Sequence, residues 1–279
     1  MATKKERQRQ LARDAYDRRQ VRQARRAKRT RQWWISSVSA VLVIGVGVGS
    51  AVLAGAFSPP KPAAAAAKAP ASPSASASAS PAPSVVPAMV NGSCVYQAAG
   101  APSRQVTLPP AKPDTTATYT ATITTNRGTI DVSLLNSKAP CTVNSFVSLA
   151  DQSFFNNTPC HRLTTAQSGI YVLQCGDPTG TGSGGPGYAY GTENLKGATY
   201  PAGTVAMANS GTADSNGSQF FLVYKNTPLP ANYTPFGTIT SGLNILQTVA
   251  AAGTDNSNGA GDGHPKDSVQ IESVTISKT

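Results

Sequence analysis

Histidine is nearly absent from this chain, which has only His161 and His264 among its 279 residues. Two histidines are too few for a convincing zinc site, and no C-x-x-C pair is present to supply thiolates. His161 has no partners for a nucleophilic triad, and His264 lies in a Gly/Asp loop. The sequence therefore disfavours a protease or an acyl-transfer enzyme, and we expect no metal and no other cofactor.

Charge is scarce outside one segment. Residues 1–32 hold 13 basic and 3 acidic side chains, which leaves 11 basic and 10 acidic ones for residues 33–279. The high isoelectric point therefore belongs to a basic tail, and we expect no nucleic-acid binding by the rest of the chain. The tail itself fits either a nucleic-acid-binding arm or a membrane-topology signal, and the segment after it favours the second.

Residues 35–57 contain no charged side chain. A helix of that length measures about 35 Å, enough to cross a bilayer. With Trp33 and Trp34 at its edge and the basic tail before it, the pattern predicts a single transmembrane helix over 33–57 with a cytoplasmic N-terminus. A cleaved signal peptide is the alternative, because Ala54-Gly-Ala56 fits an A-x-A site. The long charged region and the length of the apolar run favour an uncleaved anchor.

The remaining chain divides by composition. Residues 58–90 are almost entirely Pro, Ala and Ser up to about Ala88, which predicts a disordered, semi-extended linker. Residues 91–114 predict an arm that packs on a folded domain over 115–279. This order places the domain outside the cell membrane.

Within the domain, short strands dominate the expected structure. Two helices are predicted, over 139–150 and 242–252. The predicted strands are 118–125 and 129–135, joined by a turn at 126–128, then 204–207, 218–224, 234–239 and 269–277. Alternation on the strand 218–224 places Gln219 and Phe221 on one face and turns Phe220 toward the core. Many short strands with two helices and frequent glycine indicate a mainly β, closed structure.

Four motifs follow one another along this domain. They are Cys160-His161-Arg162, the segment 170–177 (IYVLQCGD), the glycine-rich segment 180–188, and MAN…NGSQFF between Met207 and Phe221. In this order they resemble the cyclophilin family of peptidyl-prolyl cis–trans isomerases, over about residues 118–277. The resemblance implies a closed eight-stranded antiparallel barrel capped by two α-helices.

The resemblance also implies a function: isomerisation of X–Pro bonds in extracytoplasmic proteins, which assists their folding. The alternative is a catalytically weak module of the same fold that binds proline peptides or acts as a chaperone. The presence of all the motif residues favours the enzyme.

The site residues are those that match the family's motifs. Arg162 matches the catalytic arginine, whose permanent charge suits a proline nitrogen that gains a lone pair as the bond twists. His161 is interpreted as a structural neighbour. The residues implied to bind the proline ring and the substrate backbone are Tyr171, Val172, Gln174, Ala208, Asn209, Gln219, Phe221, Leu229 and Tyr233.

Three departures from the family pattern surround this site. The loop 164–169 is longer than in well-known members, and Cys160 stands where an aromatic residue is usual. The tryptophan that many members place at the pocket rim is missing from Thr227-Pro-Leu-Pro230. That absence implies at most weak cyclosporin binding, and leaves the isomerase activity unaffected.

Four cysteines outside a membrane favour disulfide bonds, with three possible connectivities. Cys160 and Cys175 lie on strands joined by the loop 164–169, so a cross-strand bond between them is the first choice. It leaves Cys94 to tie the arm to Cys141 at the helix start. Pairing of Cys141 with Cys160 or Cys175 remains an alternative.

Overall fold

The computed structural model describes residues 87–279. The predicted basic tail (1–32), membrane anchor (33–57) and nearly all of the predicted linker (58–90) lie outside these residues. Among residues 87–279, no helix is both long and apolar enough to cross a bilayer. The anchor and the disorder of the linker therefore stay predictions.

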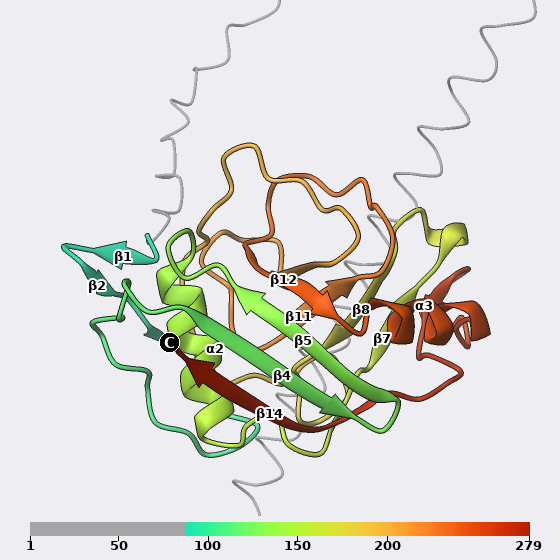
Figure 1. Ribbon diagram of the computed structural model, residues 1–279, viewed down its shortest axis with the longest axis horizontal. Helices are drawn as coiled ribbons and strands as arrows, with labels where there is room; N and C mark the ends of the chain where they lie inside the picture. The colour runs from blue at the N-terminus through green and yellow to red at the C-terminus, as the bar shows by residue number, and fades with distance from the viewer. Residues whose placement is uncertain (1–86) are drawn as a thin grey trace, which may run out of the picture. The chain divides into compact units, whose positions relative to one another are not determined.

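A curled antiparallel sheet of ten strands forms the body of the domain (Figure 1). Across the sheet, the strands are β13 (Asp262–Gly263), β7 (Arg162–Thr164), β8 (Val172–Cys175), β11 (Phe220–Val223), β10 (Thr204–Met207), β12 (Pro235–Ser241), β5 (Gly128–Leu134), β4 (Tyr119–Thr125), β14 (Gln270–Lys278) and β6 (Thr158–Pro159).

The number of strands corrects the sequence prediction, which expected a closed barrel of eight. The structure is a curled half-barrel of ten, because two elements were not foreseen. β6 and β7 are parts of one stretch of chain, interrupted only at Cys160 and His161, and β13 is a two-residue strand at the sheet edge. The N–H of Cys160 still donates to the carbonyl of Val269 (2.9 Å) next to β14. The chain next to β14 therefore bonds to the residues just before β7, although β7 lies near the other end of the sheet.

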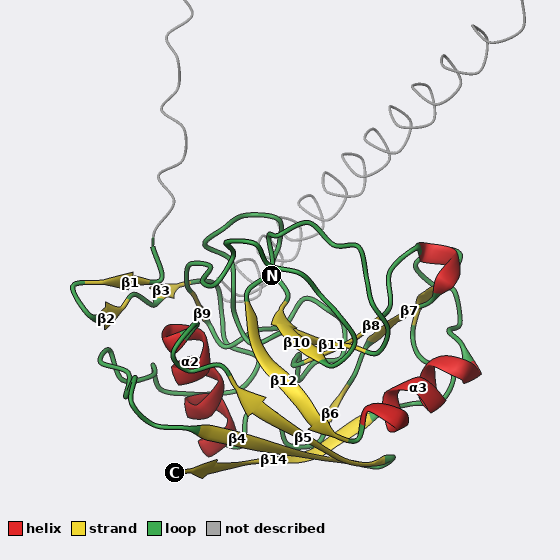
Figure 2. Cartoon of the chain, turned by 45° about the horizontal axis from the view of Figure 1, so that its top comes forward, coloured by secondary structure: helices red, strands yellow, loops and turns green. Residues whose placement is uncertain are grey.

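Two helices lie at opposite ends of the sheet, α2 (Pro140–Asp151) and α3 (Leu243–Ala252) (Figures 1 and 2). Pro140 fits the first turn of α2, where its missing N–H costs no hydrogen bond. The next two N–H groups, of Cys141 and Thr142, donate to the carboxyl group of Glu193 (3.1 and 2.7 Å). A loop distant in sequence therefore supplies the cap that the residue before α2 lacks. A short 3-10 helix (Ala166–Ser168) follows β7.

The main core lies between the sheet and α2, and its centre is aromatic. The ring of Phe146 on α2 lies 5.0 Å from that of Phe155, 5.5 Å from that of Phe220 and 5.2 Å from that of Phe236. Leu246 of α3 is buried in the same core. The predicted alternation on β11 is confirmed, since Phe220 belongs to this core and Phe221 to a second apolar cluster.

Residues before β4 pack along α2. Two short sheets form here: β1 (Met89–Val90) pairs with β2 (Ser93–Cys94), and β3 (Gln97–Ala98) pairs with β9 (Tyr188–Ala189). The hydroxyl of Tyr96 donates to the carbonyl of Cys141 (2.9 Å). We call residues 88–117 the arm, which includes the last three residues of the predicted linker.

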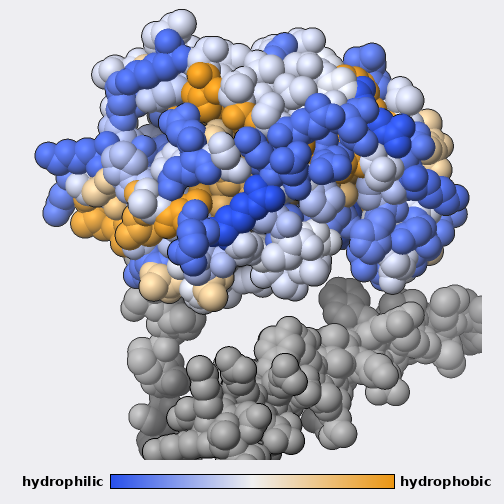
Figure 3. Space-filling view, turned by 90° about the horizontal axis from the view of Figure 1, so that it is seen from below, coloured by the Kyte–Doolittle hydropathy of each residue, from blue (hydrophilic) through white to orange (hydrophobic). Residues whose placement is uncertain are grey.

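The surface of the domain is mostly polar. The face in Figure 3 is largely hydrophilic, with several small hydrophobic patches, the largest of them on the left. In residues 87–279 the exposed large hydrophobic side chains are Val90 and Leu108, both in the arm.

Both predicted disulfide bonds are present, Cys160–Cys175 and Cys94–Cys141. The first joins the interruption between β6 and β7 to the last residue of β8. The second joins the arm to the first turn of α2. All four cysteines are therefore paired.

The Cys160–Cys175 bond should add measurably to stability, because it joins cysteines 15 residues apart in the unfolded chain. Replacing both cysteines by serine in the segment 87–279 should lower the free energy of unfolding by about 3 kcal/mol, measured by urea denaturation. The comparison variant replaces Cys94 and Cys141 by serine, which removes the other bond and should destabilise by more, about 4 kcal/mol, because those cysteines are 47 residues apart. Peptide mapping that links Cys94 to Cys160 or Cys175 would contradict the pairing.

Candidate active site

Arg162 is held by three hydrogen bonds. Its Nε and Nη2 donate to the two carboxylate oxygens of Asp262 (2.8 and 2.7 Å), and its Nη1 donates to Oε1 of Gln174 (3.2 Å). A guanidinium carries five N–H donors, so two remain for a ligand. The side chain is 32% exposed, which leaves those donors accessible.

Asp262 was not foreseen as part of the site. Strand β13 carries it, and the pairing of β13 with β7 brings it to Arg162, 100 residues away in sequence. Burial acts to raise the pKa of Asp262, but the hydrogen bonds from Arg162 and Asn258 hold it below its ordinary value. The same ion pair raises the pKa of Arg162. Both groups are therefore charged at neutral pH.

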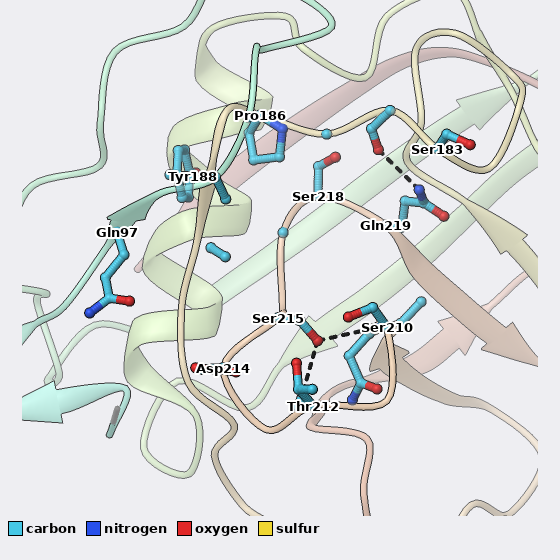
Figure 4. A pocket seen from close by; sticks show the side chains of 18 of the residues that line it. Gln97, Ser183, Pro186, Tyr188, Ser210, Thr212, Asp214, Ser215, Ser218 and Gln219 are labelled. Carbon is cyan, nitrogen blue, oxygen red and sulfur yellow. Dashed lines mark hydrogen bonds between the residues drawn. The ribbon is translucent and has the colours of Figure 1, made fainter. Parts of the chain in front are cut away.

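Two glutamines continue the network from Arg162. Nε2 of Gln174 donates to Oε1 of Gln219 (2.9 Å). Nε2 of Gln219 in turn donates to the carbonyls of Gly182 and Gly184 (2.9 and 3.0 Å; Figure 4). The amides predicted to bind substrate thus also orient each other, and they connect Arg162 to the glycine-rich segment.

Hydrogen bonds to Asp177 hold the glycine-rich segment in place. This buried carboxylate accepts hydrogen bonds from the N–H groups of Thr179 (2.8 Å) and Gly184 (3.0 Å). A Cβ at Gly184 would overlap Asp177 Oδ1, so only glycine fits there. His161 lies buried beneath Gly182, and burial lowers the pKa of His161. Its ring is therefore neutral at neutral pH, as expected for a structural residue.

An apolar cluster adjoins the polar network. Val172, Phe221 and Leu229 belong to it, and the ring of Tyr233 meets that of Phe221 edge to face at 5.5 Å. The hydroxyl of Tyr200 donates to the carbonyl of Tyr233 (2.8 Å), which fixes this part of the chain. An aromatic and aliphatic surface of this kind suits a proline ring.

Tyr171 lies apart from that cluster. Its ring meets the ring of Tyr224 at 5.9 Å, and Nζ of Lys225 lies 4.9 Å above it. Neighbouring residues of an extended chain point to opposite faces, so Tyr171 and Val172 do not share one. The structure therefore does not bring Tyr171 together with the other predicted slot residues.

Asn209 and Ala208 shape the loop after β10. Oδ1 of Asn209 accepts from the N–H of Gly211 (3.0 Å), and Nδ2 donates to the carbonyl of Asn232 (2.9 Å). The N–H of Ala208 donates to the carbonyl of Gln219 (2.9 Å). Both residues line a cavity of about 790 Å³ together with the two glutamines.

The site residues lie within the part of the chain that matches a protein-family model. The family model described as cyclophilin type peptidyl-prolyl cis-trans isomerase/CLD matches residues 120–276, or 157 residues and 56% of the chain. The chain belongs to the cyclophilin family. Arg162, Asp262 and both glutamines lie within the cyclophilin domain, whereas the arm precedes it.

Two mycobacterial proteins are similar to this chain. It is 46% identical over 200 residues to the "Probable peptidyl-prolyl cis-trans isomerase B" of Mycobacterium leprae, a match that covers 66% of each chain. It is 43% identical over 209 residues to the protein of the same name from Mycobacterium tuberculosis, which covers 68% of this chain and 65% of that protein. The match thus spans just under two thirds of these relatives' lengths. It also covers more of this chain than the cyclophilin domain alone.

Solved structures show the same fold. A crystal structure of a cyclophilin type peptidyl-prolyl cis-trans isomerase from Cryptosporidium parvum matches with a TM-score of 0.52 and 30% identity, over 58% of this chain and 99% of that one. The same protein solved in the presence of the dipeptide Ala-Pro matches with a TM-score of 0.51 and 31% identity. The similarity therefore covers a whole cyclophilin.

The position of Asp262 predicts a role in orienting Arg162. Asp262→Asn should lower the kcat/KM of proline isomerisation about tenfold, because an amide keeps the shape but loses the paired charge. The Kd for a proline peptide should change little. If the substitution instead disrupted the whole site, the Kd would rise as well. Asp151→Asn, at an exposed carboxylate, is the matched control.

The pH profile tests the same role. The pKa of Asp262 is lowered in the folded state, so the ion pair persists as pH falls and is lost only below the ordinary carboxyl range, about pH 4. The kcat/KM of the parent should therefore stay flat from about pH 8 down to about pH 5. An unchanged kcat in the Asp262→Asn variant would remove this residue from the mechanism.

Proposed function

We propose that this chain catalyses cis–trans isomerisation of the peptide bond before proline. The observation that carries the proposal is the placement of Arg162, held by Asp262 and Gln174 with two N–H donors left over. The mycobacterial and Cryptosporidium relatives, whose names state this activity, support it.

The chemistry requires only that the enzyme hold a twisted amide better than a planar one. The barrier is the double-bond character of C–N, about 18–20 kcal/mol. Twisting returns the lone pair to the proline nitrogen, which then accepts a hydrogen bond. A fixed cationic donor therefore stabilises the transition state more than either ground state. Arg162 supplies that donor.

The other site residues hold the substrate while the bond turns. Val172, Phe221, Leu229 and Tyr233 offer an apolar surface to the proline ring. Gln174, Gln219 and the chain at Ala208–Asn209 offer polar groups to the substrate backbone. We propose that β6 and β7 serve as one strand, which closes the half-barrel into the closed barrel of the family. This closure keeps Arg162 rigid.

The substrates proposed are extracytoplasmic proteins during folding. The basic residues 1–32, the uncharged run 35–57 and the Pro/Ala/Ser linker support a domain held outside the membrane. Two disulfide bonds in one domain support an oxidising compartment. The absence of tryptophan near Leu229 supports weak cyclosporin binding at most.

Arg162 gives the direct test of catalysis. Arg162→Ala and Arg162→Lys should each lower kcat/KM for a short X–Pro peptide by at least about tenfold, because lysine lacks the rigid fork. Peptide binding, followed by NMR titration, should persist, since the donor acts mainly in the transition state. Turnover in both variants equal to the parent's would exclude Arg162 from the mechanism. Absence of turnover in the parent, with binding intact, would favour the binding module.

Membrane retention tests the proposed location. The full chain should fractionate with membranes, with residues 58–279 accessible to protease added outside the cell, because the positive residues stay inside. Replacing the basic residues of 1–32 by glutamine should reduce correct insertion. A mature N-terminus at Phe57 in the culture fluid would show a cleaved signal peptide instead.

A further inference from the structure

The cavity of about 790 Å³ beside the active-site amides has a wall that the cyclophilin domain does not supply (Figure 4). One side is the glycine-rich segment, and another is the chain from Ala208 to Gln219. The third side is formed by residues 97–101 of the arm, which precede the family-matched residues 120–276.

The pairing of β3 with β9 brings the arm to the edge of the cavity. Ala98 lies opposite Tyr188, and Tyr188 is buried against Tyr96 with the rings 5.3 Å apart. Gln97 lies opposite Ala189, and both line the cavity, as does Ala99 two residues further on. Gln97, Ala98 and Ala99 are all exposed. The arm thus presents a run of accessible side chains to the cavity.

The arm wall is fixed rather than loosely attached. The N–H of Ala99 donates to the carbonyl of Gly187 (2.9 Å), and the N–H of Ser103 donates to that of Gly185 (2.8 Å). The disulfide bond Cys94–Cys141 holds the same segment to α2 a few residues earlier. The wall is therefore preorganised, which lowers the entropic cost of binding.

The cavity is continuous with the proposed substrate site. Gln174, Ala208, Asn209 and Gln219 line it, and these residues flank the apolar cluster assigned to the proline ring. A polypeptide whose proline occupies that cluster must continue on both sides. The substrate residues on one side of the proline would then enter the cavity, and we take them as its ligand.

The charge of the lining favours one kind of side chain. Asp214 is the single charged residue among those that line the cavity, and it is half-buried. The other polar lining groups are neutral amides and hydroxyls. A lysine or arginine in the substrate would therefore meet an unopposed carboxylate, whereas a glutamate would be repelled.

We propose that the arm extends the substrate groove of this cyclophilin, so that residues flanking the proline lie against Gln97 and Ala99, with a basic side chain directed to Asp214. The proposal rests on the isomerase function above. It assigns to the arm a part in substrate choice that the core residues 120–276 cannot perform alone.

The test compares substrates of two lengths on the full chain in mild detergent. One is a blocked tetrapeptide with proline third, and the others are peptides of about twelve residues extended on the N-terminal or the C-terminal side of proline. Ala99→Trp should lower kcat/KM for one of the long peptides about fivefold and leave the tetrapeptide unchanged. Gln97→Trp, at another arm residue that lines the cavity, should act alike. Ala252→Trp, at an exposed position on α3, is the control.

The charge preference is tested with long peptides that carry Lys or Glu at one flanking position. The parent should prefer Lys about threefold at low salt, and Asp214→Asn should remove the preference while leaving the tetrapeptide rate unchanged. Asp151→Asn should keep it.

Two results would overturn the proposal: long peptides turned over no better than the tetrapeptide, or arm variants that affect both lengths equally. Failure of the parent to isomerise the tetrapeptide would instead contradict the isomerase function. The groove would then still be judged by the Kd of the long peptides in the parent and in Ala99→Trp.

Discussion

The curl of the sheet determines where the active site lies. It brings the two ends of the sheet close enough for one short stretch of chain to pair with both. β6 pairs with β14 at one end, and β7 pairs with β8 near the other, with only Cys160 and His161 between. Arg162 is the first residue after that interruption. Its position is therefore set by the closure of the sheet, and the Cys160–Cys175 bond ties the same stretch to the strand that carries Gln174. A donor that acts on a twisting amide needs such rigidity, since misplacement reduces transition-state stabilisation.

Electrostatics and hydrogen bonding then fix the direction of the donor. Asp262 occupies two of the five N–H groups of Arg162, and Gln174 occupies a third. The network continues through Gln219 to the glycine-rich segment, which Asp177 holds from below. Arg162 and the two glutamines are thus held in place before substrate arrives, with two N–H groups of Arg162 left for the ligand, so little reorganisation opposes catalysis. The ion pair is only partly buried, and its value lies more in orientation than in stability.

Local sequence patterns predict much of this structure. Period-two alternation placed Phe220 in the core and Phe221 on the other face, and the loop that joins their strands paired Cys160 with Cys175. Long-range contacts were not readable. Asp262 stands in a Gly/Asp segment typical of a turn, and only the pairing of β13 with β7 reveals its partner. Tyr171 was assigned by motif position, which does not show the face a side chain takes after a longer loop. The strand count differed because the stretch 158–164 divides into β6 and β7 at Cys160 and His161, and because β13 is a strand of only two residues.

In the groove proposed above, the arm is the element that gives a fixed domain its selectivity. Turning a proline bond needs one donor and one apolar surface, and both lie within the core, so the chemistry alone gives no means of choosing among proline-containing chains. Choice must come from residues beside the proline, because differential contacts with them are what separate one substrate from another. The arm lies where such contacts would form, and its disulfide bond to α2 and its pairing with β9 keep it there. A segment added before the core can therefore change the preference of the site without altering the groups that carry out the reaction.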